Sequence, residues 1–355
     1  MSTLSSVAVV KGPAETGFSP EPLARYLDAH LPGRWCDLEL RRFVGGQSNP
    51  TYLLAADKRK VVLRKQPEGR LLPSAHALDR EFRVMQALGT TDVPVPKMIH
   101  FCSDLNVIGT LFYLMEHVSG RVFKDPLLES LPRAERGALY DAMNASLAKL
   151  HGVDYAACGL ADYGRPGNYF ARQIERWTRQ YRDSETGTIA AMDELMRHLP
   201  QLVPADDRSS IVHGDFRLEN LIFHETEPVV LAILDWELST VGHPLADLAY
   251  NCFAYHLPRR AFGGFADISL EETGIPSEED YIEAYFSRTG IRPLAPWGFY
   301  IAFALFRLAA ILQGILHRAL DGNASSPDAL EHGNLAGLCA EAGLAALDTS
   351  PGGRK

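Results

Sequence analysis

His213–Asn220 reads HGDFRLEN, and the later segment Leu231–Glu237 reads LAILDWE. Asp215 and Asn220 are five positions apart in the first segment, and Asp235 directly follows the apolar run of the second. The apolar run places Asp235 at the end of a strand, so the three polar residues together are more specific than any one of them. The two segments indicate one polar site, built from a loop and a strand end.

The residues between these segments predict a β-hairpin. Leu221–Phe223 and Val229–Leu234 are short apolar runs, and His224–Pro228 between them has the composition of a turn. A hairpin returns the chain to the edge where it began, so we expect Asp235 on the same side as Asn220.

Asp215, Asn220 and Asp235 have the chemistry that phosphoryl transfer requires. A carboxylate at Asp215 can orient an incoming hydroxyl and accept its proton. Asn220 offers a neutral amide oxygen and Asp235 a charged one, and Mg²⁺ prefers a few hard oxygen ligands together with phosphate and water. The pattern indicates one catalytic base and two magnesium ligands. A turn that happens to carry an acidic residue is the structural alternative.

Short strands and one helix precede this site. Hydrophobic residues at helical spacing predict a helix over Ser74–Leu88. Strands are expected at Leu38–Val44, Thr51–Ala56, Val61–Arg64, Lys97–Cys102 and Leu111–His117.

From Ser119–Gly120 onward the pattern is mainly helical, apart from the β segment Ile211–Leu234. Helices are expected at Arg133–His151, Tyr169–Ser184, Ile189–His198, Ser277–Thr289, Pro296–Leu320 and Pro327–Ala346. The sequence thus predicts an α+β fold in three parts. Residues 1–33 are a lead-in with a first helix, residues 34–117 a small antiparallel-sheet lobe with one main helix, and residues 118–355 a larger helical lobe with the catalytic loop and substrate pocket.

The composition is that of a globular protein with an acidic balance. The chain has 355 residues, of which 46% are hydrophobic and 22% charged, and its net charge is −9. Nucleic acids and anionic membranes bind basic surfaces, so we expect neither as a partner. The partner expected is a small molecule with a hydroxyl group, and the oligomeric state stays open.

Three features bear on location. The five cysteines are scattered without a CxxC pair, which favours reduced thiols. The first fifteen residues lack the basic and apolar regions of a signal peptide. Tyr300–Leu316 is apolar, but Arg307 and Gln313 interrupt it, which favours a buried helix over a membrane span. We expect a cytoplasmic protein.

HGDFRLENLIF, followed by LAILDWELSTVGHPLADLAY, closely resembles the aminoglycoside phosphotransferase family, which has a protein-kinase-like fold. The resemblance extends from about Phe43 to Leu320. The stretch VLRKQPEGRLLPSAHALDREFRVMQAL is most similar to one branch, the kinase domains fused ahead of acyl-CoA dehydrogenase domains. We find no dehydrogenase region in the sequence and expect no flavin. The resemblance implies a two-lobed kinase fold with ATP and Mg²⁺ as cofactors, and it leaves the choice between ATP and GTP open.

The resemblance also implies residue roles. Asp215 is the catalytic base, while Asn220 and Asp235 hold Mg²⁺. His213 would brace the catalytic loop, and Asp247 would cap a helix and anchor it against that loop, so both are structural.

A glycine turn lies between the first two expected strands, where kinases have their phosphate-covering loop. It consists of Gly45, Gly46, Gln47, Ser48 and Asn49. Glycines let the backbone approach phosphates, and successive N–H groups can surround them. The turn departs from the protein-kinase pattern GxGxxG, and a plain hairpin turn is the alternative.

The third expected strand should supply a cation for the nucleotide phosphates. Arg64 stands where protein kinases have lysine and can make bidentate contacts. Lys65, one residue further, would point to the opposite face of the strand and is the alternative. Glu81 on the next helix is the expected ion-pair partner, unless it is a solvated helix charge.

The segment Tyr113–Val118 matches the adenine-binding hinge of the family. Backbone N–H and C=O groups at Glu116 and Val118 would face the adenine edge.

The expected function is transfer of the γ-phosphate of ATP to a hydroxyl of a small molecule. The fused relatives imply a hydroxyacyl-CoA-like acceptor, and Arg172, Arg176 and Arg179 share one helix face that could receive an anion, with a solvated face as the alternative. An aminoglycoside, choline, homoserine or a sugar remains an alternative acceptor. A nucleotide-binding pseudokinase without catalysis and an acyl-CoA dehydrogenase are the rival functions.

Overall fold

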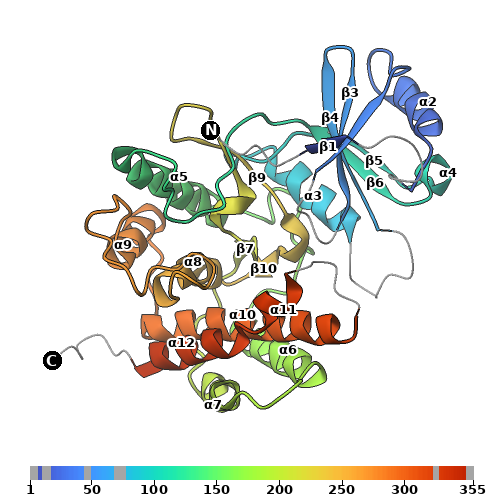
Figure 1. The fold of residues 1–355 in the computed structure, drawn as a ribbon. Coiled ribbons are helices and arrows are strands. Elements are labelled where there is room, and N and C mark those ends of the chain that lie inside the picture. Colours follow the sequence, from blue (N-terminus) through green and yellow to red (C-terminus); the bar gives the residue numbers. More distant parts are fainter. Residues whose placement is uncertain (1–6, 10–16, 44–48, 68–76, 323–327, 349–355) are drawn as a thin grey trace. The chain divides into compact units, whose positions relative to one another are not determined.

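The computed structural model describes residues 7–9, 17–43, 49–67, 77–322 and 328–348, and the chain divides into two compact units. Unit 1 comprises Met1–Phe123 and Glu219–Glu237, and unit 2 comprises Lys124–Leu218 and Leu238–Lys355. Unit 1 contains an antiparallel sheet, and unit 2 contains most of the helices (Figure 1). The predicted α+β class, with an antiparallel-sheet part and a mainly helical part, is confirmed.

The sheet of unit 1 has six described strands in the order β1-β2-β3-β4-β6-β5, with every neighbouring pair antiparallel. Their bounds are β1 Val7–Val9, β2 Glu39–Phe43, β3 Thr51–Ala56, β4 Arg59–Lys65, β5 Met98–Cys102 and β6 Phe112–Glu116. Five of these strands lie where the sequence predicts them. β1, which pairs with β2, was not predicted, because three residues are too few to show an alternating pattern.

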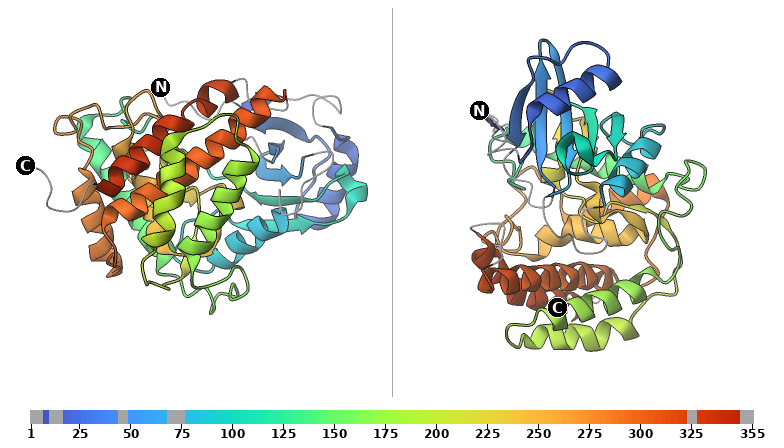
Figure 2. Two further views of the ribbon diagram at one scale, coloured as in Figure 1. Left: turned by 90° about the horizontal axis from the view of Figure 1, so that it is seen from below. Right: turned by 90° about the vertical axis from the view of Figure 1, so that its right-hand side faces the viewer.

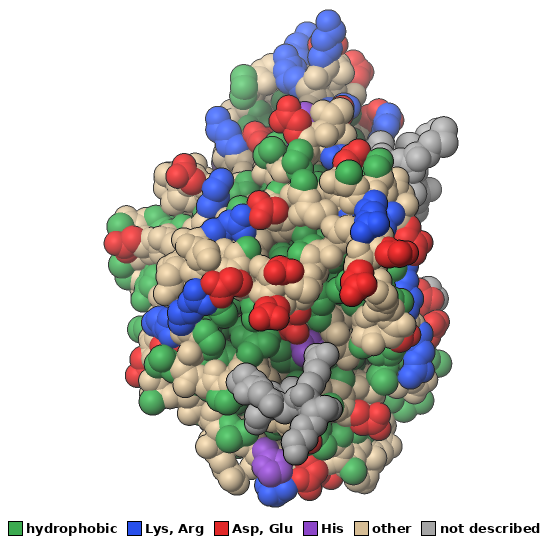
Figure 3. Space-filling view, turned by 90° about the vertical axis from the view of Figure 1, so that its left-hand side faces the viewer, with side chains coloured by type: hydrophobic (Ala, Val, Ile, Leu, Met, Phe, Trp, Pro, Cys, Tyr) green, Lys and Arg blue, Asp and Glu red, His purple; other side chains and the backbone are tan. Residues whose placement is uncertain are grey.

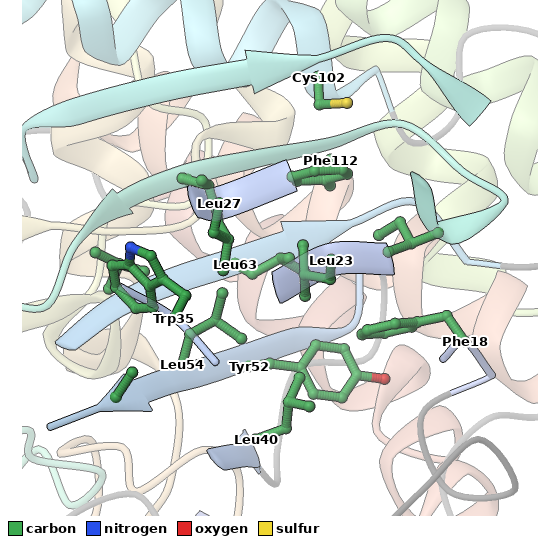
Figure 4. Packing of buried hydrophobic residues seen from close by; sticks show 14 residues of the cluster. Phe18, Leu23, Leu27, Trp35, Leu40, Tyr52, Leu54, Leu63, Cys102 and Phe112 are labelled. Carbon is green, nitrogen blue, oxygen red and sulfur yellow. The ribbon is translucent and has the colours of Figure 1, made fainter. Parts of the chain in front are cut away.

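Helices α2 (Pro20–His30) and α3 (Leu78–Leu88) pack with this sheet. Leu23 and Leu27 of α2 are fully buried in one hydrophobic cluster with Leu54 and Leu63 of the sheet (Figure 4). Helix α2, which the sequence placed in a lead-in segment, therefore belongs to the core of the sheet, because the apolar face of the helix is buried in this cluster. A short helix, α4 (Leu105–Ile108), connects β5 to β6.

The predicted hairpin consists of β8 (Leu221–Phe223) and β9 (Val230–Ile233). Arg121 forms an antiparallel bridge with Phe223, and the N–H of Ile233 donates to the carbonyl of Pro94 at 2.9 Å. These backbone bonds attach the hairpin to unit 1, whereas the sequence-based division placed it inside residues 118–355.

Unit 2 is organised around the 24-residue helix α10. Helices α6, α8, α11 and α12 all contact α10, and α10 and α12 lie side by side (Figure 2). The helices are α5 Arg133–His151, α6 Tyr169–Asp183, α7 Ala190–His198, α8 Pro244–Cys252, α9 Glu278–Thr289, α10 Trp297–Leu320, α11 Ala329–Gly333 and α12 Ala336–Asp348. Two short strands, β7 (Ser210–Val212) and β10 (Thr240–Gly242), pair antiparallel.

Helix α10 is the one described helix that is long and apolar enough to cross a membrane. Of its most apolar 18-residue window, 78% is buried inside the structure. A helix that forms the centre of a packed unit passes the same test of length and hydropathy.

Two helical segments of unit 2 differ from the expectation. The helix expected over 327–346 is divided into α11 and α12 near Gly333 and Asn334, two residues of low helix propensity. Helix α8 was not given bounds, although His243 and Pro244 mark its start as N-cap and first helical residue.

On the face drawn in Figure 3, acidic, basic and hydrophobic side chains are interspersed.

Candidate active site

Arg64 and Lys65 of β4 point to opposite faces of the sheet. The Arg64 side chain is 13% exposed, and its Nε lies 3.0 Å from a carboxylate oxygen of Glu81 on α3. Lys65 is buried on the other face, with its Nζ 5.1 Å from the ring centroid of Phe18. The strand pleat separates the two cations, so Arg64 is the one that meets Glu81. Its contact with nucleotide phosphates stays a prediction.

Glu81 is a buried carboxylate surrounded by donors. It accepts hydrogen bonds from the amide of Asn49 at 3.2 Å, the hydroxyl of Tyr113 at 3.0 Å and the guanidinium of Arg64 at 3.3 Å. Burial raises the pKa of Glu81, and the Arg64 charge opposes that rise. Burial raises the pKa of Tyr113 as well, so its hydroxyl remains a donor. This network fixes the orientation of Arg64.

Asn49 is the one residue of the expected phosphate-covering turn that the structure describes. It is buried, at 1% exposure, and its amide is directed at Glu81. Gly45, Gly46, Gln47 and Ser48 lie outside the described residues. In the structure, Asn49 therefore supports the Arg64–Glu81 pair. Its expected contact with the nucleotide stays a prediction.

Asp235 and Glu237 bring two more carboxylates to Arg64. Arg64 Nη2 lies 3.0 Å from Asp235 Oδ1 and 3.8 Å from Glu237 Oε2. Asp235 has a φ of +66°, a left-handed conformation that Asp tolerates better than most residues. One ligand atom each from Glu81, Asp235 and Glu237 lie within 4.8 Å of one another. These hard oxygen donors fit Mg²⁺.

Asn220 closes the hairpin next to Asp235. Its backbone carbonyl accepts a hydrogen bond from the N–H of Leu234 at 2.8 Å, and the following residues of the two strands pair as Leu221 with Ile233. The loop end and the strand end therefore meet at one end of the hairpin. This meeting agrees with the predicted hairpin, and the role of the two side chains as metal ligands stays a prediction.

The expected hinge lies at the end of β6. The N–H of Glu116 donates to the carbonyl of Lys97 at 2.9 Å, so this N–H is already used within unit 1. The predicted adenine contact of Glu116 can therefore involve only its backbone carbonyl. Val118 follows the strand in an irregular segment, and its adenine contact stays a prediction.

In unit 2, Asp247 of α8 anchors the catalytic loop. Its carboxylate is buried and accepts hydrogen bonds from the backbone N–H groups of His213, at 2.5 Å, and Gly214, at 2.8 Å. Burial favours the neutral form, but His151 and these bonds hold the pKa of Asp247 below its usual value. The N-cap of α8 is His243, so the prediction that Asp247 caps this helix is wrong. The prediction that Asp247 anchors the helix to the catalytic loop is correct.

His213 and Gly214 shape the loop without reaching solvent. The Nδ1 of His213, which is fully buried, accepts the N–H of Asp215 at 3.2 Å. Gly214 has a φ of +85°, and a Cβ there would lie 2.7 Å from the carbonyl oxygen of Leu238. Both the backbone conformation and the close approach require glycine in the HGD sequence.

Asp215 lies among groups from three elements of unit 2. Its Oδ1 is 3.3 Å from Nε of Arg217, and Asn251 of α8 donates to the next carbonyl, that of Phe216, at 3.1 Å. Burial, followed by the charge of Asp215, raises the pKa of Tyr250 on α8, which also shares a hydrogen bond with Asp215. Arg307 of α10 donates to the carbonyl of Gly214 at 2.5 Å.

Sequence reasoning missed several residues around the site. Glu237 contacts Arg64, Tyr113 bonds Glu81 and Tyr250 bonds Asp215, and none of these contacts was predicted. Arg307 bonds the carbonyl of Gly214, next to Asp215, and this contact was not predicted either. Arg307 had a signal, because it interrupts an apolar helix. The other three were hidden, since their partners come from distant parts of the chain.

The phosphotransferase enzyme family matches residues 39–291 of the sequence. The chain belongs to this family. The matched region contains Arg64, Glu81, Asp215, Asn220 and Asp235, and the predicted family membership is confirmed. Members of this family are transferases of the kinase type.

Curated relatives share much of the chain but are longer. It is 50% identical over 306 residues to mouse acyl-CoA dehydrogenase family member 10, covering 86% of this chain and 29% of that protein. It is 43% identical over 333 residues to human acyl-CoA dehydrogenase family member 11, covering 92% of this chain and 43% of that protein. The chain thus spans less than half the length of these relatives.

Solved structures confirm the predicted protein-kinase-like fold. One from Ralstonia eutropha, assigned as an aminoglycoside phosphotransferase, is 49% identical with a TM-score of 0.85, covering 93% of this chain and 98% of that one. A variant of the aminoglycoside phosphotransferase APH(4)-Ia, in complex with AMP-PNP and hygromycin B, is 15% identical with a TM-score of 0.61, covering 92% and 99%. The second likeness concerns the fold alone.

Proposed function

We propose that this phosphotransferase-family chain transfers the γ-phosphate of ATP to a hydroxyl of a small molecule, with Mg²⁺ as cofactor. The observation that carries the proposal is the carboxylate set of Glu81, Asp235 and Glu237 around Arg64. A set of hard oxygen donors beside a buried guanidinium suits a metal-bound triphosphate. The AMP-PNP complex of a protein with this fold supports the choice of nucleotide.

Each residue has a part in the proposed reaction. Asn220 and Asp235 would hold Mg²⁺, with Glu237 as a further oxygen donor, and the metal would supply positive charge against the phosphates. Arg64 binds the phosphates, while the carbonyl of Glu116 and the backbone of Val118 bind adenine.

Asp215 orients the acceptor hydroxyl and takes its proton. The hydroxyl oxygen forms a bond to the γ-phosphorus as the bond from phosphorus to the bridging oxygen of ADP breaks. ADP and the phosphorylated acceptor are the products, and the proton remains on Asp215 until it is released to water.

For the acceptor we propose a hydroxyacyl-CoA-like compound. The names of the curated relatives refer to acyl-CoA chemistry, and the phosphates of CoA would suit arginines. The complex with hygromycin B makes an aminoglycoside the second candidate, and choline and homoserine complete the set. We place the enzyme in the cytoplasm, acting on small molecules without a nucleic-acid or membrane partner, in keeping with its net charge of −9.

The test is ADP release from ATP–Mg²⁺ with a panel of acceptors from all four classes. We expect stimulation by a hydroxyacyl-CoA. Asp215→Asn should lower turnover by about 10²–10⁴-fold while the affinity for AMP-PNP stays within about threefold. Asp235→Asn should instead weaken Mg²⁺-dependent nucleotide binding.

The exposed Asp183 at the end of α6 gives a matched control, and Asp183→Asn should behave like the wild type. Equal turnover by wild type and Asp215→Asn would refute the mechanism. Nucleotide binding without turnover of any acceptor would favour a pseudokinase. Stimulation by an aminoglycoside alone would replace the hydroxyacyl-CoA as the proposed acceptor. Replacing ATP by GTP in the same assay tests the nucleotide preference. A visible spectrum with flavin absorbance would point to a dehydrogenase.

A further inference from the structure

Arg307 is a buried cation in the centre of unit 2. It is 5% exposed, and its guanidinium carbon lies 5.0 Å from the ring centroid of Tyr250 and 5.6 Å from that of Trp177. Among the described residues, the guanidinium, which has five N–H donors, forms one hydrogen bond, to the carbonyl of Gly214. No carboxylate pairs with it in the part of the chain that the structure describes. A buried charge with so few partners is costly unless an anion accompanies it.

Arg176 of α6 brings a second cation to the same indole ring. Its guanidinium carbon lies 5.3 Å from the ring centroid of Trp177, the ring that Arg307 also contacts. Burial, and then the charges of Arg307 and Arg179, lower the pKa of Arg176. Arg179 follows one helical turn later on the same face. Two guanidinium groups therefore contact Trp177, and Arg179 adds a third positive charge one helical turn from Arg176.

Arg176 and Arg179 differ from Arg182 of α6 in lacking an acidic partner among the described residues. Arg172 donates to the backbone carbonyls of Gly167 and Arg165, so it holds the preceding loop in place. Arg182 pairs with Glu185 at 3.1 Å and with Asp193 at 2.6 Å. By contrast, across the described ranges neither Arg176 nor Arg179 forms an ion pair.

This cluster of Arg176, Arg179 and Arg307 adjoins the proposed proton acceptor. Arg307 binds the carbonyl of Gly214, the residue before Asp215. It also stacks on Tyr250, the aromatic side chain that shares a hydrogen bond with Asp215. A group bound at the cluster would thus lie near the acceptor hydroxyl.

We propose that Arg176, Arg179 and Arg307 form a binding site for an anionic group of the acceptor. The inference rests on the proposed function for the location of the acceptor, but the binding itself can be measured without catalysis. Guanidinium groups bind phosphate and carboxylate oxygens through paired N–H donors. Arg179 and the partly desolvated Arg176, both on the surface of α6, contact the anion, and the buried Arg307 adds charge behind them. The site therefore takes an acceptor bearing a phosphate ester or a carboxylate and repels a polycation.

Binding is tested by isothermal titration calorimetry of the full chain saturated with AMP-PNP and Mg²⁺. The probes are coenzyme A, for phosphate esters, 3-hydroxybutyrate, for carboxylates, and hygromycin B as a polycation. The double variant Arg176→Gln, Arg179→Gln removes the exposed charges and leaves the buried Arg307 in place. Arg182→Gln is the matched control, because it removes one charge from the same helix at an exposed position. AMP-PNP affinity is measured for each variant.

We expect one of the two anions to bind the wild type, with affinity that falls as KCl is added. The double variant should lose at least about tenfold in anion affinity, Arg182→Gln should lose less than about twofold, and AMP-PNP affinity should not change. Binding of coenzyme A alone identifies a phosphate ester, and binding of 3-hydroxybutyrate alone identifies a carboxylate. Equal anion affinity in the double variant, or binding of hygromycin B alone, overturns the site.

The two proposals fail in different ways. If a neutral or cationic acceptor is phosphorylated and neither anion binds, the kinase function stands and the anion site is refuted. If no acceptor is phosphorylated but an anion binds in an Arg176-dependent manner, the site stands and the proposed function is refuted.

Discussion

Arg64 and Asp235 are 171 positions apart in the chain, and Arg64 Nη2 donates to Asp235 Oδ1 at 3.0 Å. The same guanidinium bonds Glu81, so one side chain connects β4, α3 and the end of the hairpin. Arg64 thereby links the buried carboxylate that orients it to the carboxylate predicted to hold magnesium. The Arg64 guanidinium thus lies among the carboxylates of Glu81, Asp235 and Glu237, next to the expected position of the metal-bound nucleotide.

The pair of Arg64 and Glu81 should show strong coupling in a double-mutant cycle. Arg64→Met leaves Glu81 buried without its cation and should cost about 3–5 kcal/mol of stability. Adding Glu81→Gln should recover part of that loss, because no buried carboxylate remains. Urea unfolding of the two single variants and the double variant measures the coupling.

The exposed pair of Arg41 and Glu39 supplies the control for this cycle. Their side chains are 42% and 45% exposed, so their coupling should be below about 1 kcal/mol. Coupling of the same size in both cycles would contradict a structural role for Arg64 and Glu81. Arg64→Met should also raise the KM for ATP in the acceptor assay, whereas Arg41→Met should not.

Gly214→Ala should destabilise unit 2 and reduce turnover. The left-handed conformation alone costs a non-glycine residue about 1–2 kcal/mol, and the contact with Leu238 adds to it. Gly159 has a φ of +83° with no heavy atom within 4 Å of a Cβ, so Gly159→Ala isolates the conformational cost. Thermal melting and turnover of the two variants separate the cost of the backbone conformation from the cost of the close contact with Leu238. Equal losses in both would mean that the close approach at Gly214 contributes nothing.

Asp247→Asn should loosen the catalytic loop. One carboxylate oxygen becomes an NH₂ group, which cannot accept from the backbone N–H of His213 or Gly214. Loss of a hydrogen bond to a buried charge costs about 1.5–3 kcal/mol. We expect a lower melting temperature and lower kcat at unchanged AMP-PNP affinity. Asp141→Asn, at a position 62% exposed, should change none of these, and normal turnover of Asp247→Asn would contradict the anchor.

Asp206 should contribute to stability in a pH-dependent way. Burial alone would raise the pKa of Asp206, but Arg208 and His243 hold it at about 2. Because the folded pKa lies below the unfolded value of about 3.9, the stabilisation is present above pH 4 and is lost as the pH falls towards 2. At neutral pH it amounts to at most about 2.6 kcal/mol.

The variant Asp206→Asn tests this pH dependence. The difference in melting temperature between wild type and variant should be constant from pH 7 to about 5 and should shrink between about pH 4 and 2. A difference that persists unchanged to pH 2 would show that packing, and not the charge of Asp206, supplies the stability.

The sequence by itself determined the local features of this protein. The spacing of Asp215, Asn220 and Asp235, the alternation in β4 and the helical periodicity of α3 depend on neighbours a few positions away. Such patterns are visible in one chain because hydrogen bonding and side-chain direction repeat with a short period. They identified the family's motif and the main elements of the sheet.

Only the tertiary structure decided which of those residues meet. The choice of Arg64 over Lys65 depends on which face of β4 packs against α3, and the attachment of the hairpin depends on backbone bonds to Pro94 and Arg121. The gathering of Arg176 and Arg307 around Trp177 depends on the packing of α6 against α10. Contacts between residues a hundred or more positions apart leave no periodic trace in the sequence, since burial of a shared surface alone brings them together.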